Sequence, residues 1–113
     1  MITIYHNPRC SKSRESVCFL DEKGIEFETF KYLDEKITKS ELTSIIKKLN
    51  IKPIELVRTK ETLWKDNFKG KELSDDEIIT IMVENPVLIE RPIIINGDKA
   101  VIGRPTERIL EII

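Results

Sequence analysis

The chain has 113 residues, 40% of them hydrophobic, and this length and composition predict a single compact domain over residues 1–113. Nineteen Lys and Arg residues against twenty Asp and Glu give a net charge of -1, which argues against nucleic acid or an anionic membrane as the main partner. No stretch reaches the roughly 20 apolar residues that span a bilayer, and two cysteines are fewer than small domains carry in oxidising compartments. We therefore expect a cytoplasmic protein, and we expect it to be a monomer.

The N-terminal third predicts a strand, a helix and a second strand. Residues 2–5 (Ile-Thr-Ile-Tyr) favour β structure, and a helix is expected over residues 10–23, ended by Gly24. Residues 27–32 are aromatic and β-favouring, which predicts a second strand reached by a βαβ crossover. The two strands should therefore be parallel.

The middle of the chain predicts helices. Two capping boxes, each a Ser or Thr three residues before a Glu, begin at residues 38 and 74. Apolar residues follow the first box at helical spacing, namely Leu42, Ile45, Ile46 and Leu49. The helix after the second box should end near Asn85-Pro86, and residues 53–64 predict shorter helical pieces. A segment of this length, about residues 38–85, cannot bury its own core, so we interpret it as a helical insertion and not as a separate domain.

The last third predicts a β-hairpin and a short helix. Strands at residues 93–95 and 99–102 flank Asn96-Gly97, a pair that readily adopts the left-handed dihedral angles of a tight turn. A helix is expected over residues 106–113, with Pro105 in its first turn. The order β-α-β, helices, β-β-α predicts an α/β fold with a mixed four-stranded sheet, which is the thioredoxin-like arrangement.

Cys10 lies where the first predicted strand leads into the first helix, in a run that also contains His6 and three cations: Arg9, Lys12 and Arg14. Positive charge and the N-terminus of a helix both lower the pKa of a thiol, and the thiolate is the nucleophilic form. These surroundings predict a reactive thiolate, although a cysteine can also be a small buried core residue. His6, the single histidine, could support the thiolate or could simply satisfy a turn.

The second cysteine, Cys18, falls in the middle of the first predicted helix beside Val17 and Phe19, which favours packing over chemistry. On one helix its Cα atom would lie about 12 Å from that of Cys10, too far for a disulfide. Ser13 occupies the place of the second cysteine in a Cys-x-x-Cys motif. Its hydroxyl can donate to a thiolate but cannot resolve a mixed disulfide.

Spacing excludes several other chemistries. A cysteine-dependent phosphatase loop would need an arginine six residues after Cys10, where this chain has Ser16. The chain has neither a phosphate-binding P-loop nor a dinucleotide-binding glycine motif. His6, Cys10 and Cys18 are too few ligands for a zinc site, so no metal is expected.

Three arginines stand out by their context: Arg58, Arg91 and Arg104. Each could be a solvated surface charge. Arg91 and Arg104, however, flank the predicted hairpin and precede prolines, which places them at strand ends where thioredoxin-like folds build their sites. A cluster of guanidinium groups suits an oxyanion, because guanidinium binds tetrahedral oxyanions with two parallel hydrogen bonds and stays charged at all working pH values.

Taken together, these motifs resemble one known family. They are Ile4-Tyr5-His6-Asn7-Pro8-x-Cys10-x-x-Ser13-Arg14, the Leu-x-Arg that ends at Arg58, Asn85-Pro86, Leu88-Ile89-x-Arg91-Pro92-Ile93, and Arg104-Pro105. The chain is similar over nearly its whole length to the glutaredoxin-dependent arsenate reductases of the ArsC type, and most of all to the shorter arsenate-reductase-related members.

The resemblance implies a role for each matching residue. Cys10 would attack the arsenic atom, and His6 and Ser13 would help to hold it as a thiolate. The anion-binding arginines would be Arg58, Arg91 and Arg104. Pro92 would be the cis-proline that thioredoxin-like folds place opposite the reactive thiol.

The resemblance also implies an outside source of electrons. No bound cofactor is expected; glutathione would be the co-substrate and glutaredoxin or glutathione the partner, which fits the absence of a resolving cysteine at Ser13. Two alternatives stay open: a redox-responsive regulator of the same fold family that binds RNA polymerase, and a monothiol reductase of glutathionylated substrates. The departures from classical reductases are Arg9, Ser11 and Lys12, where small residues are usual, and these could alter affinity for the substrate or for glutathione.

Overall fold

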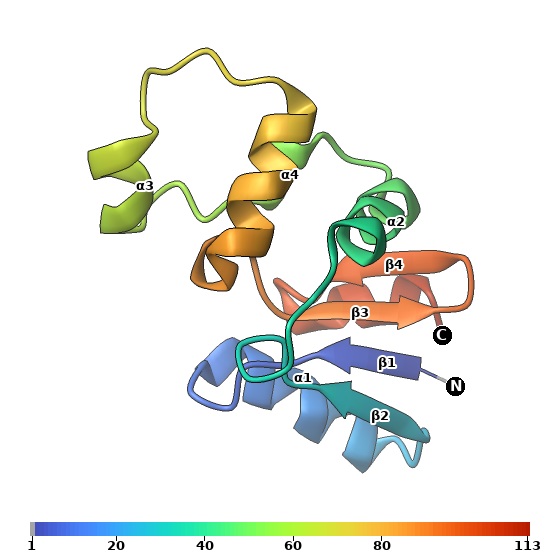
Figure 1. Cartoon of the computed structure of the whole chain (residues 1–113). Coiled ribbons are helices and arrows are strands. Elements are labelled where there is room, and N and C mark those ends of the chain that lie inside the picture. The colour runs from blue at the N-terminus through green and yellow to red at the C-terminus, as the bar shows by residue number, and fades with distance from the viewer. Residues whose placement is uncertain (1) are drawn as a thin grey trace. The chain divides into compact units, whose positions relative to one another are not determined.

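The structure is a computed structural model that describes residues 2–113, and its path is shown in Figure 1. The chain forms two compact units. The sheet unit contains the residues up to Glu35 together with Arg91–Ile113, and the helical unit is Lys36–Glu90. The helical unit contains the whole segment, about residues 38–85, for which a helical insertion was expected.

The sheet unit contains a four-stranded sheet with the order β2-β1-β3-β4. The strands are β1 (Ile2–Tyr5), β2 (Phe27–Phe30), β3 (Ile93–Asn96) and β4 (Lys99–Ile102). Strand β1 pairs in parallel with β2 and antiparallel with β3, and β3 pairs antiparallel with β4. The mixed sheet predicted from the sequence is confirmed, including the parallel crossover and the antiparallel hairpin.

Two helical segments of the sheet unit contribute to one core with the sheet: α1 (Ser11–Glu22) and the 3-10 helix η3 (Thr106–Glu111). The buried cluster joins Leu20 of α1 and Ile109 of η3 to four strand residues, Ile2, Ile4, Ile94 and Val101. Helix α1 ends where Gly24 takes a positive φ of 68°, and the Gly24 N–H donates to the carbonyl of Asp21. This is the predicted glycine stop.

Two details at the C-terminal end differ from the expectations. The residues between β3 and β4 are Gly97 and Asp98, because Asn96 pairs with Lys99 in the ladder. Gly97 has a positive φ of 63° and Asp98 does not, a pattern typical of a type II′ turn. The final helix is a 3-10 helix with Pro105 as its N-cap residue, and the peptide bond before Pro105 is cis.

The helical unit consists of α2 (Lys39–Leu49), η1 (Pro53–Leu56), α3 (Thr62–Asn67), α4 (Asp75–Glu84) and η2 (Pro86–Leu88). Both predicted caps are present: Thr38 Oγ1 accepts from the Glu41 N–H at 3.1 Å, and Ser74 Oγ accepts from the Glu77 N–H at 3.2 Å. Helices α2 and α4 pack against each other, as seen in Figure 1. None of the helices within residues 2–113 is long and apolar enough to cross a membrane.

Candidate active site

The loop between β1 and α1 is organised by Asn7, which is buried. Its side-chain Oδ1 accepts from the Arg9 N–H at 3.0 Å, and its carbonyl accepts from the Cys10 N–H at 3.0 Å. Its own N–H donates to Ser13 Oγ at 3.0 Å. The sequence indicated a turn at Asn7-Pro8, but these three bonds, which fix the start of α1, were not anticipated.

Cys10 is the N-cap residue of α1, with an extended backbone and 9% of its surface exposed. Its side chain makes no capping hydrogen bond of good geometry. Burial raises the pKa of the Cys10 thiol, but the N–H groups of Ser13 and Lys12 and the Arg91 guanidinium outweigh it, so that the pKa lies below its ordinary value. The predicted thiolate is therefore supported at the start of the helix, where backbone N–H groups lack helical partners.

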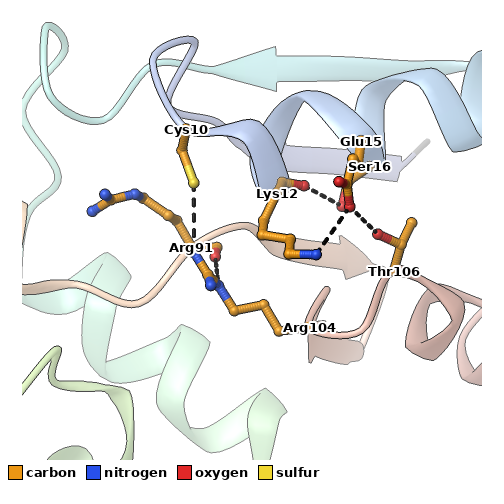
Figure 2. Close-up of polar contacts among 7 residues, drawn as sticks. All are labelled: Cys10, Lys12, Glu15, Ser16, Arg91, Arg104 and Thr106. Carbon is orange, nitrogen blue, oxygen red and sulfur yellow. Dashed lines mark hydrogen bonds and ion pairs between the residues drawn. The ribbon is translucent and has the colours of Figure 1, made fainter.

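Two arginines from the C-terminal part of the sheet unit, Arg91 and Arg104, lie near the thiol. Arg104 Nη2 donates to Cys10 Sγ at 3.5 Å, and Arg104 Nε donates to the Arg91 carbonyl at 2.6 Å; both bonds are drawn in Figure 2. Burial lowers the pKa of Arg91, but Cys10 and Tyr32 raise it, and the net shift is upward. Arg91 therefore stays protonated beside the sulfur. The Arg91–Pro92 peptide bond is cis, the geometry expected from the resemblance.

His6 and Ser13 contact each other. His6 Nδ1 lies 2.7 Å from Ser13 Oγ, which already accepts the N–H of Asn7. The pKa of His6 lies below its ordinary value, because burial disfavours the charged ring and Lys31 and Arg14 add positive charge nearby. A neutral His6 can accept the Ser13 hydroxyl proton, in which case Nε2 carries the ring proton.

The cations that neighbour Cys10 in the sequence have other contacts. Lys12 Nζ lies 3.5 Å from Glu15 Oε2, and Arg14 Nη1 donates to the Pro8 carbonyl at 2.9 Å. The expectation that their side chains activate the thiol is thus replaced by a contribution from Arg91 and from the backbone of α1. These side chains lie in the exposed first turn of the helix, so they extend into solvent.

Cys18 is exposed and free, so the prediction that it packs in the core is wrong. The buried residues of α1 are Ser13, Ser16 and Leu20. Cys18 lies on the opposite side of the helix at 100° per residue. Its apolar sequence neighbours Val17 and Phe19 are only partly buried.

Arg58 belongs to the helical unit and is held there by two carboxylates. Its Nε lies 3.1 Å from Glu61 Oε1, and its Nη1 lies 3.3 Å from Glu90 Oε1. The Arg58 N–H also donates to the Leu88 carbonyl at 2.7 Å. The role of Arg58 in binding an anion stays a prediction.

The sheet unit thus brings together a thiol of lowered pKa, two guanidinium groups and the N–H groups of a helix start. This set can stabilise a thiolate and can also neutralise an oxyanion placed against the sulfur. Within residues 2–113, no three His, Cys, Asp or Glu side chains are arranged to hold a metal ion.

The parallel crossover, the antiparallel hairpin and a cysteine at the start of α1 define a thioredoxin-like α/β protein. A model of one protein family matches residues 5–112, and it describes the ArsC family. The chain belongs to this family, which confirms the resemblance read from its motifs.

Individual proteins agree with this assignment. The chain is 48% identical to an arsenate reductase of Haemophilus influenzae, over 99% of this chain and 98% of that protein. It is 33% identical to an arsenate reductase of Escherichia coli, over 99% of this chain but 80% of that protein. The structure of an arsenate reductase from Vibrio cholerae superimposes with a TM-score of 0.94 at 41% identity, covering 99% of this chain and 97% of that one. The chain therefore matches the Haemophilus influenzae and Vibrio cholerae proteins over nearly their whole length, whereas the Escherichia coli protein is longer.

Proposed function

We propose that the protein reduces arsenate to arsenite, with Cys10 as the nucleophile and glutathione and glutaredoxin as the source of electrons. The observation that carries the proposal is the buried Cys10 thiol of lowered pKa, contacted by Arg104 at 3.5 Å. Family membership supports the class of oxidoreductase, and similar proteins bear the name arsenate reductase.

In the proposed reaction the Cys10 thiolate attacks arsenic, forms a sulfur–arsenic bond and displaces one arsenate oxygen, which leaves as water. The thiol of glutathione then attacks this adduct. Two electrons pass to arsenic, which is released as arsenite, and the two sulfurs are joined as a Cys10–glutathione disulfide. Glutaredoxin reduces that disulfide and restores Cys10. In total, one arsenate and two thiols give one arsenite, one disulfide and one water.

The surrounding residues would act by charge and hydrogen bonding. Arg91 and Arg104 would bind arsenate oxygens and neutralise the charge that develops on them, as would Arg58. The N–H groups of Ser13 and Lys12 keep the pKa of Cys10 low between cycles. We assign His6 and Ser13 to holding the first turn of α1 beside the sulfur, through the 2.7 Å contact between their side chains.

The test is an arsenate reduction assay with glutathione and glutaredoxin that compares wild type with Cys10→Ser and Arg91→Ala. We expect no turnover from Cys10→Ser, and for Arg91→Ala a loss of roughly 10²-fold or more in kcat/KM, the usual effect of removing one electrostatic contact of this kind. Cys18→Ser is the matched control for loss of a thiol, because that cysteine is exposed. Absence of turnover in wild type would reject arsenate as the substrate.

A second assay with the same protein distinguishes arsenate reduction from the alternative function, a monothiol reductase of glutathionylated substrates. A glutathionylated peptide replaces arsenate, and release of glutathione is followed. Deglutathionylation that exceeds arsenate turnover, and that Arg91→Ala lowers less than it lowers arsenate reduction, would favour that alternative. Such a reaction needs Arg91 only to lower the pKa of Cys10 and not to bind an oxyanion. We also propose that the protein is a monomer and that it is located in the cytoplasm. Size-exclusion chromatography would test the first proposal and cell fractionation the second.

A further inference from the structure

Gly103 lies directly after β4 in the sheet unit, next to Arg104. It is not among the residues of positive φ, so its backbone angles do not explain a glycine here. Its surroundings do. A Cβ atom at this position would meet three atoms at short distance: Ile94 Cδ1 at 2.8 Å, Ser16 Oγ at 2.9 Å and Pro92 Cγ at 3.1 Å. Carbon atoms in contact are ordinarily separated by about 3.5–4.0 Å.

These three neighbours have little freedom to withdraw. Ser16 and Ile94 are fully buried, and so is Pro92. Ser16 Oγ donates to the Lys12 carbonyl at 3.3 Å, which keeps its side chain against α1. The Pro92 ring is rigid, and Ile94 belongs to the core cluster. A side chain at position 103 would therefore displace the backbone of residue 103 itself.

The backbone at Gly103 is joined to the site by a short series of hydrogen bonds. The Gly103 N–H donates to the Pro92 carbonyl at 2.9 Å. The next residue, Arg104, donates from Nε to the Arg91 carbonyl at 2.6 Å and from Nη2 to Cys10 Sγ at 3.5 Å. Figure 2 shows the Arg104 guanidinium between these two acceptors. A backbone shift at residue 103 would reach Arg104 directly, because the two residues are adjacent in the chain.

We propose that Gly103 is a positioning residue: its lack of a side chain lets the chain after β4 close against Ser16 and Pro92, and this approach places the Arg104 guanidinium at Cys10. The inference rests on Cys10 working as a thiolate in the proposed function. It does not depend on which oxyanion the site accepts.

The test is the rate of alkylation of Cys10 by iodoacetamide as a function of pH. All variants carry Cys18→Ser, because the exposed second thiol would otherwise react as well. We expect Gly103→Ala to raise the midpoint of the titration by about half a pH unit or more, because a cation beside the sulfur is displaced. Arg104→Ala should give a similar shift, and the double variant should not exceed Arg104→Ala alone. A Gly103→Ala midpoint equal to that of wild type would overturn the inference.

Rescue distinguishes positioning from general damage. Ile94→Val removes Cδ1 and Ser16→Ala removes Oγ, the two nearest atoms. Adding both changes to Gly103→Ala should return the midpoint toward the wild-type value, whereas a triple variant that titrates like Gly103→Ala would contradict the steric argument. If Gly103→Ala alone does not fold, Gly103→Ala with Ile94→Val carries the test, because it keeps the short contacts with Ser16 and Pro92.

Gly24→Ala is the matched control for loss of stability. Gly24 has a φ of 68°, and no atom lies within 4 Å of a Cβ placed there, so alanine adds strain without a clash. We expect Gly24→Ala to lower the unfolding temperature and to leave the Cys10 midpoint unchanged. A wild-type midpoint at the free-thiol value of about 8.5 would remove the thiolate and the proposed function with it. A low midpoint that Gly103→Ala raises, in a protein that does not reduce arsenate, would reject arsenate and leave the role of Gly103 intact.

Discussion

Ser13 uses one hydroxyl for two contacts inside the protein. Its side chain is fully buried, accepts from the Asn7 N–H at 3.0 Å and lies 2.7 Å from His6 Nδ1. Ser13→Ala would leave a buried N–H without its acceptor, so we expect the free energy of unfolding to fall by about 1–3 kcal/mol. Urea unfolding at neutral pH measures this change. Ser11→Ala, at an exposed position of the same helical turn, should change it little.

Ser13→Ala also shows whether the hydroxyl or the backbone N–H of Ser13 lowers the pKa of Cys10. The pKa of Cys10 is lowered by the Ser13 N–H and by Arg91, and alanine retains the N–H. Ser13→Ala should therefore raise the Cys10 midpoint less than Arg91→Ala does in the alkylation experiment. The opposite order would mean that the hydroxyl itself stabilises the thiolate, as the Cys-x-x-Ser spacing first indicated.

The lowered pKa of His6 predicts that the stability of the protein rises with pH in one pH range. Its pKa in the folded protein lies below the ordinary value, so between the two values the unfolded chain binds more protons. Stability should be fully present above the unfolded value of about 6.5 and should be lost as the pH falls toward the folded pKa. His6→Asn should flatten this part of the curve, which we would measure by urea unfolding between pH 7.5 and about 5.5, above most carboxylate titrations.

An independent measurement needs no unfolding. The chain has one histidine, so its ring proton resonance can be assigned without ambiguity in an NMR titration. We expect a midpoint below 6.5 in the folded protein. A midpoint at or above that value would contradict the lowered pKa of His6.

At the scale of elements, the β3–β4 hairpin depends on Gly97. Its φ of 63° is unfavourable for other residues, while no atom lies within 4 Å of an added Cβ. Gly97→Ala should therefore cost about 1–2 kcal/mol of stability through backbone strain alone. Gly97→Asn should cost less, because asparagine tolerates the left-handed region.

Asp98→Ala is the control for the hairpin, since Asp98 is exposed and its φ is not positive. Thermal unfolding of the three variants should rank Asp98→Ala nearest to wild type, then Gly97→Asn, then Gly97→Ala. Equal losses at both positions would contradict a turn in which Gly97 has a positive φ and Asp98 does not.

Elements with local signals were predictable from the sequence. The Thr38 and Ser74 caps begin α2 and α4 as expected, because a capping side chain and its N–H partner lie within one turn. The inner face of α1 was not predictable from hydropathy. Two of its three buried residues, Ser13 and Ser16, are polar. Ser16 is small because Gly103 approaches it closely, a long-range contact that leaves no local pattern.

At the scale of the whole molecule, the contacts of the site that join residues far apart in the sequence were also hard to predict. The thiol and the start of its helix follow from one short motif, whereas the arginine contacts depend on bringing residues 91 and 104 close to Cys10 in the folded sheet unit. Arg91 and Arg104 could be predicted as site residues, because each precedes a proline at the end of a predicted strand. The sequence did not indicate that the side chains of Lys12 and Arg14, which are nearer to Cys10 in the chain, contact Glu15 and Pro8 instead.

The distance between the two cysteines determines whether they can form a disulfide with each other. Both are free, with Cys10 at the N-cap of α1 and Cys18 exposed on the same helix. Eight residues of helix place their Cα atoms about 12 Å apart, well beyond the span of a disulfide. In the proposed mechanism, a thiol from another molecule must therefore resolve the adduct on Cys10.

This arrangement predicts the products of oxidation. Oxidised glutathione should give a mixed disulfide at Cys10, which mass spectrometry of the intact chain and its peptides would detect, and glutaredoxin should remove it. Cys18→Ser should retain wild-type turnover with glutathione and glutaredoxin, because Cys18 takes no part in electron transfer in the proposed mechanism. A Cys10–Cys18 disulfide within one molecule would require α1 to unwind during the reaction. Either that disulfide or loss of turnover in Cys18→Ser would refute the monothiol mechanism.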